Sequence, residues 1–125
     1  MRYLLDTHAL LWALGDPRVV CRPARDVLAS AANIIFVSSA SLWECAIKAS
    51  IGKLELPDHV FDAIPETGYE VLPIRLSYLN AYRALPLQHR DPFDRMFVAQ
   101  ARAEFLILIT RDPEIAKYDV ALLRC

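Results

Sequence analysis

The sequence predicts an α/β protein: a three-layer α/β/α sandwich with a central parallel sheet. Short apolar segments alternate with helical patterns almost throughout the chain, as parallel strands joined by helical crossovers require. Two of these segments, residues 34–37 and 105–109, are continuously apolar, which is typical of strands covered on both faces. The chain has 125 residues, which suits a single domain over residues 1–125.

Turn residues divide the first half of the chain. Gly15-Asp16-Pro17 has strong turn chemistry, Pro23 suits a helix start, and Gly68 suits a helix end. Trp43 belongs to an apolar stripe at helical spacing. The expected elements are a strand over residues 2–5, helices over 8–14 and 23–32, a strand over 34–37, a helix that starts within 38–41, and a short helix over 59–67.

The second half follows the same alternation. Pro73 is poorly suited to a central strand, so the strand over residues 70–74 is expected at an edge of the sheet. Asp91-Pro92 is a helix start, because Asp is a favoured N-cap and Pro is tolerated in the first turn. The expected elements are the edge strand, a helix over 76–85, a helix from Pro92, a strand over 105–109, a helical turn over 114–118 and a strand over 120–123.

Composition narrows the class of protein. Apolar residues make up 55% of the chain, so we expect a second copy or a partner to cover part of the surface. No uncharged apolar run reaches the roughly 18 residues that cross a bilayer, and Asp6 interrupts the N-terminal apolar residues, so neither a membrane span nor a signal peptide is expected. The net charge of the protein is −1, so binding of nucleic acid would depend on local basic patches. Cys21, Cys45 and Cys125 are widely spaced, which favours reduced cysteines in a cytoplasmic protein.

Acidic residues follow the predicted strands. Asp6 comes directly after the first strand, and Asp112 lies just past the strand over residues 105–109. Glu44 lies one to two turns into its helix, and Asp94 lies in the first turn of the helix that starts at Asp91-Pro92. The carboxyl ends of parallel strands meet at the edge where α/β proteins bind ligands, so these four acids are expected to converge there. Asp91 is a fifth candidate.

Each acid also has a structural explanation. Asp6 and Asp112 suit the capping of the helical segments that follow them. Glu44 is placed to pair with Lys48 four residues later, and Asp94 occupies the capping-box position of its helix. The functional interpretation therefore depends on the joint placement of the acids.

Clustered carboxylates require cations, because they repel one another. Oxygen ligands without a Cys or His pattern favour Mg²⁺ or Mn²⁺, and such ions suit phosphodiester hydrolysis, for which they activate water and neutralise the leaving oxygen. His89 precedes the helix start and is a candidate contact to substrate. Arg95 is a candidate phosphate contact or a partner for a site acid, and Arg90, Arg102 and Arg111 are further phosphate-contact candidates.

Four motifs in order resemble the PIN-domain nucleases, and within them the VapC-type toxins of bacterial toxin–antitoxin pairs. The matching segments are LLDTHALLW (4–12), SSASLWE (38–44), HRDPFDR (89–95) with AQA (99–101), and TRD (110–112). Together they extend over nearly the whole chain. The fourth motif departs mildly from the family pattern, because Arg111 and Pro113 flank Asp112 and alter the loop that carries it.

The resemblance implies a PIN-like fold and a Mg²⁺- or Mn²⁺-dependent endoribonuclease. The family's four acids map onto Asp6, Glu44, Asp94 and Asp112, which would hold the metal and carry the catalysis. Accessory positions near this site would be the acid Asp91, the hydroxyl residues Thr7, Ser39 and Thr110, and Arg95.

The resemblance also implies partners. Family members commonly form homodimers and are inhibited by a cognate antitoxin, which often inserts a basic side chain at the acids. An apolar groove for the antitoxin would use residues on two helices: Leu10, Leu11, Leu14, Trp43 and Ile47. The RNA substrate is not readable from the sequence.

Three other classes of protein compete with this interpretation. A response-regulator receiver needs an acidic pair after its first strand, where this chain has Asp6 alone. An Asp-nucleophile phosphatase needs Asp-x-Asp, which Asp6-Thr7-His8 lacks. A catalytically inactive PIN-like binding module is the alternative to the nuclease, and metal-dependent cleavage separates the two.

Overall fold

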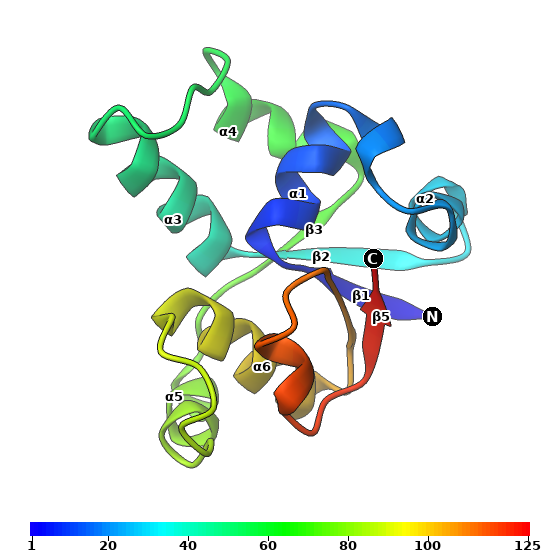
Figure 1. The fold of residues 1–125 in the computed structure, drawn as a ribbon. Coiled ribbons are helices and arrows are strands. Elements are labelled where there is room, and N and C mark those ends of the chain that lie inside the picture. Colours follow the sequence, from blue (N-terminus) through cyan, green and yellow to red (C-terminus); the bar gives the residue numbers. More distant parts are fainter.

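Five parallel strands form one sheet at the centre of the protein (Figure 1). The structure is a computed structural model that describes residues 1–125, apart from the side chain of Pro17. In the sheet order β3-β2-β1-β4-β5, the strands are β3 (Glu70–Leu72), β2 (Ile34–Ser38), β1 (Arg2–Leu5), β4 (Ile107–Thr110) and β5 (Leu122–Arg124). The central strand pairs Leu5 with Val37 of β2 and with Ile109 of β4. The predicted α/β class with a parallel sheet is confirmed.

Helices cover both faces of this sheet. In Figure 1, α1 and α2 lie on one face and α5 and α6 on the other, while α3 contacts both α1 and α6. Within the described residues, no helix combines the length and apolar character that a membrane crossing requires. The α-helices are α1 (Thr7–Leu14), α2 (Arg22–Ala29), α3 (Ser39–Ser50), α4 (Val60–Ala63), α5 (Leu76–Arg83) and α6 (Pro92–Glu104), and short 3₁₀ turns are η1 (Pro17–Val19), η2 (Ile64–Thr67) and η3 (Ile115–Lys117).

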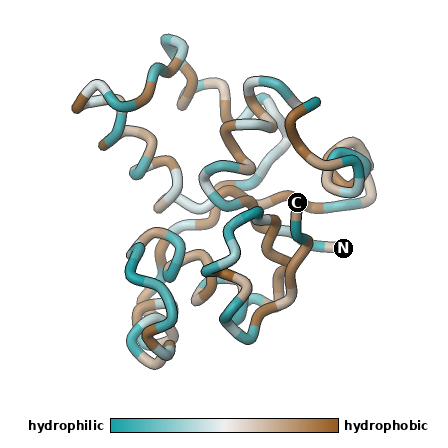
Figure 2. Tube along the Cα trace, viewed as in Figure 1, coloured by the Kyte–Doolittle hydropathy of each residue, from teal (hydrophilic) through white to brown (hydrophobic). Residues whose placement is uncertain are grey.

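The alternation of side chains along β1 divides the core into two clusters. Leu4 points to the α5–α6 face, where it packs with Phe97 and Leu108. Leu5 points to the α1–α2 face, where its cluster includes Leu10. Apolar segments accordingly gather along the strands, with hydrophilic segments toward the loops (Figure 2). Burial of β1 on both faces explains why the three residues that follow Arg2 in this strand are Tyr, Leu and Leu.

Some predicted boundaries were wrong for local reasons. Phe105 was expected to begin a strand, but it ends α6 in the left-handed region at φ 55° and is 90% exposed. The helix expected over residues 59–67 is split into α4 and η2, because Pro65 lacks the N–H that an α-helix would use there. The edge strand β3 stops at Leu72, directly before Pro73, and its edge position is confirmed.

The prediction of reduced cysteines was wrong for two of the three. A disulfide joins Cys21, at the start of α2, to Cys125 after β5, with 5.3 Å between the two Cα atoms. Cys45 is free and buried. The paired cysteines are 104 positions apart, so their spacing in the sequence gave no indication that the fold brings them together.

Candidate active site

Asp94, Asp112 and His89 come together at the carboxyl edge of the sheet. Asp94 lies in the first turn of α6, Asp112 follows β4, and His89 lies in the loop before α6. The His89 Nε2 atom is 2.8 Å from Asp94 Oδ2 and 3.5 Å from Asp112 Oδ2. Among the described side chains, these three offer donor atoms that all lie within 4.8 Å of one another.

The N-terminus of α6 leaves the Asp94 carboxylate free for this group. Asp91 is the N-cap, and its Oδ1 accepts hydrogen bonds from the backbone N–H groups of Phe93 at 2.8 Å and Asp94 at 3.1 Å. The Asp94 side chain therefore does not serve as the cap, and it faces His89 instead. The prediction of Asp91 as the N-cap is thus confirmed, and the Asp94 side chain has His89 as its partner.

Asp6 is buried beside this group and serves as a cap at the same time. Its Oδ1 accepts from the backbone N–H of Ala9 at 2.8 Å, which caps α1. Its Oδ2 accepts from the Thr110 hydroxyl at 2.6 Å. Since Thr110 Oγ1 also accepts from the backbone N–H of Asp112 at 3.0 Å, this hydroxyl connects the ends of β1 and β4.

Asp112 divides its two carboxylate oxygens between a turn and the acid group. Oδ1 accepts from the backbone N–H of Glu114 at 2.8 Å, so Asp112 caps the turn that follows, as its structural explanation predicted. Oδ2 faces His89. One oxygen thus fixes the loop while the other remains directed at the site.

Glu44 is buried on α3 and has two partners. It accepts a hydrogen bond from the Thr7 hydroxyl at 2.5 Å, and it forms an ion pair with Lys48 at 2.8 Å. The pairing with Lys48 was the structural alternative to a metal-binding role. Glu44 therefore lies at the same edge of the sheet but outside the group of Asp94, Asp112 and His89.

Burial and neighbouring charges make the Asp94 carboxyl a weak acid. The pKa of Asp94 is raised from 3.8 to about 7, mainly because burial removes its solvation. The hydrogen bond from His89 lowers this pKa in part, and the negative charges of Asp91, Asp6 and Asp112 contribute to raising it. Burial also raises the pKa of Asp6, against the effect of its hydrogen bonds from Thr110 and Ala9. The negative charge of these buried carboxylates is not fully balanced by nearby positive charge, and a divalent cation would supply that balance.

Two of the accessory candidates, Ser39 and Arg95, have the following surroundings. Ser39 follows Ser38, which caps α3 through a hydroxyl oxygen that accepts from the backbone N–H of Ala40 at 3.1 Å. Ser39 is the first helical residue and is half-buried. Arg95 does not pair with an acid: its buried guanidinium donates to Pro86 O at 3.1 Å and to the Tyr118 hydroxyl at 3.0 Å.

The buried Arg95 instead supports the loop that carries His89. The Tyr118 hydroxyl that accepts from Arg95 also accepts from the backbone N–H groups of Gln88 at 3.3 Å and His89 at 3.0 Å. Sequence reasoning placed His89 near substrate but did not anticipate its contact with two acids. The available signal was its position two residues before the N-cap Asp91.

The fold and the position of the acids define an α/β protein with a candidate ligand site at the carboxyl ends of its parallel strands. The chain belongs to the PIN domain family, whose model matches residues 3–121. Members of this family are in general nucleases that use divalent metal ions. The donor set of this chain, with several carboxylates at one edge, fits such an ion.

Solved structures with the same fold match over nearly the entire chain. One is VapBC2 from Rickettsia felis bound to a DNA fragment from their promoter, with a TM-score of 0.75, 18% identity, and coverage of 99% of this chain and 98% of that chain. Another is DNA-bound VapBC from Salmonella typhimurium, with a TM-score of 0.72, 14% identity, and coverage of 99% of this chain and 98% of that chain. A third is FitAcB from Neisseria gonorrhoeae, with a TM-score of 0.68, 19% identity, and coverage of 99% of this chain and 97% of that chain. At these identities the likeness concerns the fold. No curated protein sequence matches the chain.

Proposed function

We propose that this protein is a Mg²⁺- or Mn²⁺-dependent endoribonuclease that acts as the toxin of a toxin–antitoxin pair. The observation that carries the proposal is the group of acids at the carboxyl edge, in which Asp94 has a pKa of about 7. Membership of the PIN family supports a nuclease, and the likeness to VapBC and FitAcB structures supports a toxin.

Asp6, Glu44, Asp94 and Asp112 would hold the metal and act as the catalytic acids. The bound ion would activate water for attack on a phosphodiester and neutralise charge on the leaving oxygen. The Thr110 hydroxyl orients Asp6 at 2.6 Å, and in this proposal it keeps one carboxylate edge aligned with Asp112.

Glu44 would have to change partners to bind the ion. Its ion pair with Lys48 lies at the surface on the lysine side, where that side chain is 41% exposed, so the lysine can move into solvent at little cost. The buried Thr7 hydroxyl would then keep the Glu44 carboxylate in place. In the metal-free protein, the Lys48 ammonium thus supplies the positive charge that balances the Glu44 carboxylate.

RNA would approach from the side of the loop before α6. Arg90 is exposed in this loop and lines, with Gln88, His89 and Glu114, a cleft of about 400 Å³. A guanidinium in the same cleft as His89 is suited to hold a substrate phosphate. We therefore propose Arg90, rather than the buried Arg95, as the phosphate contact of this region.

The first experiment is RNA cleavage by the antitoxin-free protein. Total RNA is incubated with Mg²⁺, with Mn²⁺ or with EDTA, and new RNA ends are mapped. Discrete ends that require metal and disappear in Asp94→Asn support the nuclease, while Asp26→Asn, an exposed acid on α2, serves as the matched control. Equal cleavage by Asp94→Asn, or none by the natural protein, would instead favour the inactive PIN-like binding module.

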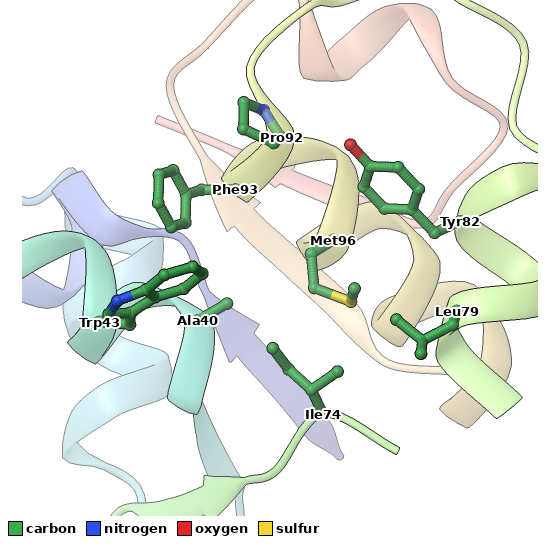
Figure 3. Close-up of a pocket in the computed structure, with 8 residues that line it drawn as sticks. All are labelled: Ala40, Trp43, Ile74, Leu79, Tyr82, Pro92, Phe93 and Met96. Atoms are coloured by element: carbon green, nitrogen blue, oxygen red, sulfur yellow. The ribbon is translucent and has the colours of Figure 1, made fainter. Parts of the chain in front are cut away.

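The antitoxin would bind an apolar groove next to the site. This groove has a volume of about 360 Å³, and Figure 3 shows the rings of Trp43 and Phe93 beside each other at one side of it, with Leu79 and Tyr82 on the other side. Trp43 is 60% exposed, and its ring centroid lies 5.6 Å from that of Phe93. The residues that line the groove are Ala40, Trp43, Ile74, Leu79, Tyr82, Pro92, Phe93 and Met96.

Not all residues first expected to contact the antitoxin are available for binding. Leu10 is 1% exposed and belongs to the core, so its assignment was wrong. Leu11 and Leu14 line a separate groove of about 250 Å³ beside residues 54–57. In our proposal an amphipathic segment of the antitoxin packs over Trp43 and directs a basic side chain at Asp94.

A substitution at the groove tests this surface. Trp43→Asp should abolish co-purification with the cognate antitoxin and leave RNA cleavage intact. Phe105→Asp is the matched control, because Phe105 is equally apolar and 90% exposed but lies at the opposite end of α6. Retained binding in Trp43→Asp would contradict the assignment of the groove.

We also propose that the protein is a homodimer. Large apolar side chains are exposed on the chain, including Leu76 at 82% and Leu87 at 78%, and a second copy would cover part of this surface. Analytical ultracentrifugation tests the proposal directly. A monomer at all concentrations up to about 100 μM, a concentration at which even dimers with a Kd in the micromolar range form, would contradict it.

A further inference from the structure

The carboxyl-edge site contains one nitrogen donor in addition to its oxygens. The His89 Nε2 atom lies 2.8 Å from Asp94 Oδ2 and 3.5 Å from Asp112 Oδ2. Adjacent ligand atoms around a small divalent ion, each about 2.1 Å from it, are separated by about 3 Å. The spacing of His89 from the two acids is therefore that of neighbouring ligands of one ion.

The fold holds the backbone of His89 in position independently of the acids. The backbone N–H of His89 donates to the Tyr118 hydroxyl at 3.0 Å, and that hydroxyl also receives the buried Arg95 guanidinium at 3.0 Å. The His89 side chain is only 18% exposed. A donor that is held by its own backbone and largely shielded from water is pre-organised for a ligand.

We propose that His89 is a nitrogen ligand of the divalent ion bound by Asp94 and Asp112, and that it makes the site prefer Mn²⁺ to Mg²⁺. This inference rests on the proposed function for the presence of an ion. Magnesium binds oxygen donors and keeps much of its water, whereas imidazole nitrogen favours first-row transition ions. An all-oxygen site, as the sequence predicted, would give no such preference.

The experiment measures metal binding directly. Mn²⁺ and Mg²⁺ are titrated separately into EDTA-treated full-length protein by calorimetry, and pulsed electron paramagnetic resonance of bound Mn²⁺ detects nitrogen coupling. His89→Gln retains an N–H group that can reach Asp94 but lacks the imidazole lone pair. His59→Gln is the matched control, because His59 also lies near an acid, 3.5 Å from Asp62, but is 86% exposed at the start of α4.

We expect nitrogen coupling in the natural protein and in His59→Gln, and its loss in His89→Gln. In His89→Gln the affinity for Mn²⁺ should fall by about tenfold or more, while that for Mg²⁺ changes by less than about threefold. Labelling histidines with ¹⁵N should convert the coupling to that of ¹⁵N without any substitution, so the assignment does not depend on a variant that folds.

Absence of nitrogen coupling, or of Mn²⁺ binding, in the natural protein would overturn the proposal. Equal weakening of Mn²⁺ and Mg²⁺ in His89→Gln would also overturn it, because that pattern identifies a residue that only orients Asp94. Cleavage of RNA is measured on the same samples. Metal-dependent cleavage without nitrogen coupling would support the nuclease activity and reject His89 as a metal ligand. Nitrogen coupling without cleavage would support His89 as a metal ligand and reject the nuclease activity.

Discussion

Replacing Asp94 by asparagine should stabilise the metal-free protein at alkaline pH. In the folded protein the pKa of Asp94 is about 7, against 3.8 ordinarily, mainly because the carboxyl is buried. The folded state therefore holds this proton more tightly than the unfolded state. The stability that Asp94 contributes is fully present below pH 3.8 and is lost as the pH rises to about 7.

The size of this effect follows from the two pKa values. Each pH unit between them corresponds to about 1.4 kcal/mol, so ionised Asp94 lowers the free energy of unfolding by up to about 4 kcal/mol at pH 8. Between pH 5 and pH 8 the loss is about 3 kcal/mol. Asparagine has a similar shape and does not ionise, so Asp94→Asn removes this pH dependence.

Urea unfolding in EDTA at pH 5 and pH 8 measures the difference. The free energy of unfolding of Asp94→Asn, relative to that of the natural protein, should be about 2–3 kcal/mol more favourable at pH 8 than at pH 5. The exposed control Asp26→Asn should differ from the natural protein by less than about 0.5 kcal/mol at both pH values. The same effect of Asp94→Asn at pH 5 and at pH 8 would refute the reasoning.

Three further predictions concern stability. Reduction of the Cys21–Cys125 disulfide, which closes a loop across 104 positions, should lower the free energy of unfolding by about 2–5 kcal/mol, measured by urea unfolding with and without reductant. Phe105→Gly should raise the free energy of unfolding by about 0.5–1 kcal/mol, measured by thermal unfolding, because glycine adopts φ 55° without strain. A lower free energy of unfolding would mean that the exposed ring of Phe105 makes a stabilising contact. Thr110→Val should lower the free energy of unfolding by about 1–3 kcal/mol, because Asp6 Oδ2 loses its buried hydrogen-bond donor. Urea unfolding measures this effect, and an unchanged midpoint would contradict the prediction.

Local patterns in the sequence account for most of the architecture. The apolar segments that became β1, β2 and β4 were recognisable because strands covered on both faces carry few polar residues. Asp91-Pro92 located the start of α6 because N-cap chemistry acts within one turn. Phe105 was misassigned because the same local reasoning cannot distinguish an exposed aromatic at a helix end from a buried one in a strand.

The placement of acids beyond the strand ends was also available from the sequence, since a parallel sheet brings its carboxyl ends to one edge. Their catalytic role stays a prediction. Which groups meet there was decided only by the tertiary structure, which brings His89 to Asp94 and Asp112 and the Thr7 hydroxyl to Glu44.

The disulfide between Cys21 and Cys125 and the buried position of Arg95 were likewise settled by the fold alone. The physical reason is the same in each case. Periodicity and capping depend on neighbours along the chain, whereas hydrogen bonds, ion pairs and disulfides depend on distances between distant segments to within about 1 Å, and those distances exist only once the layers have packed.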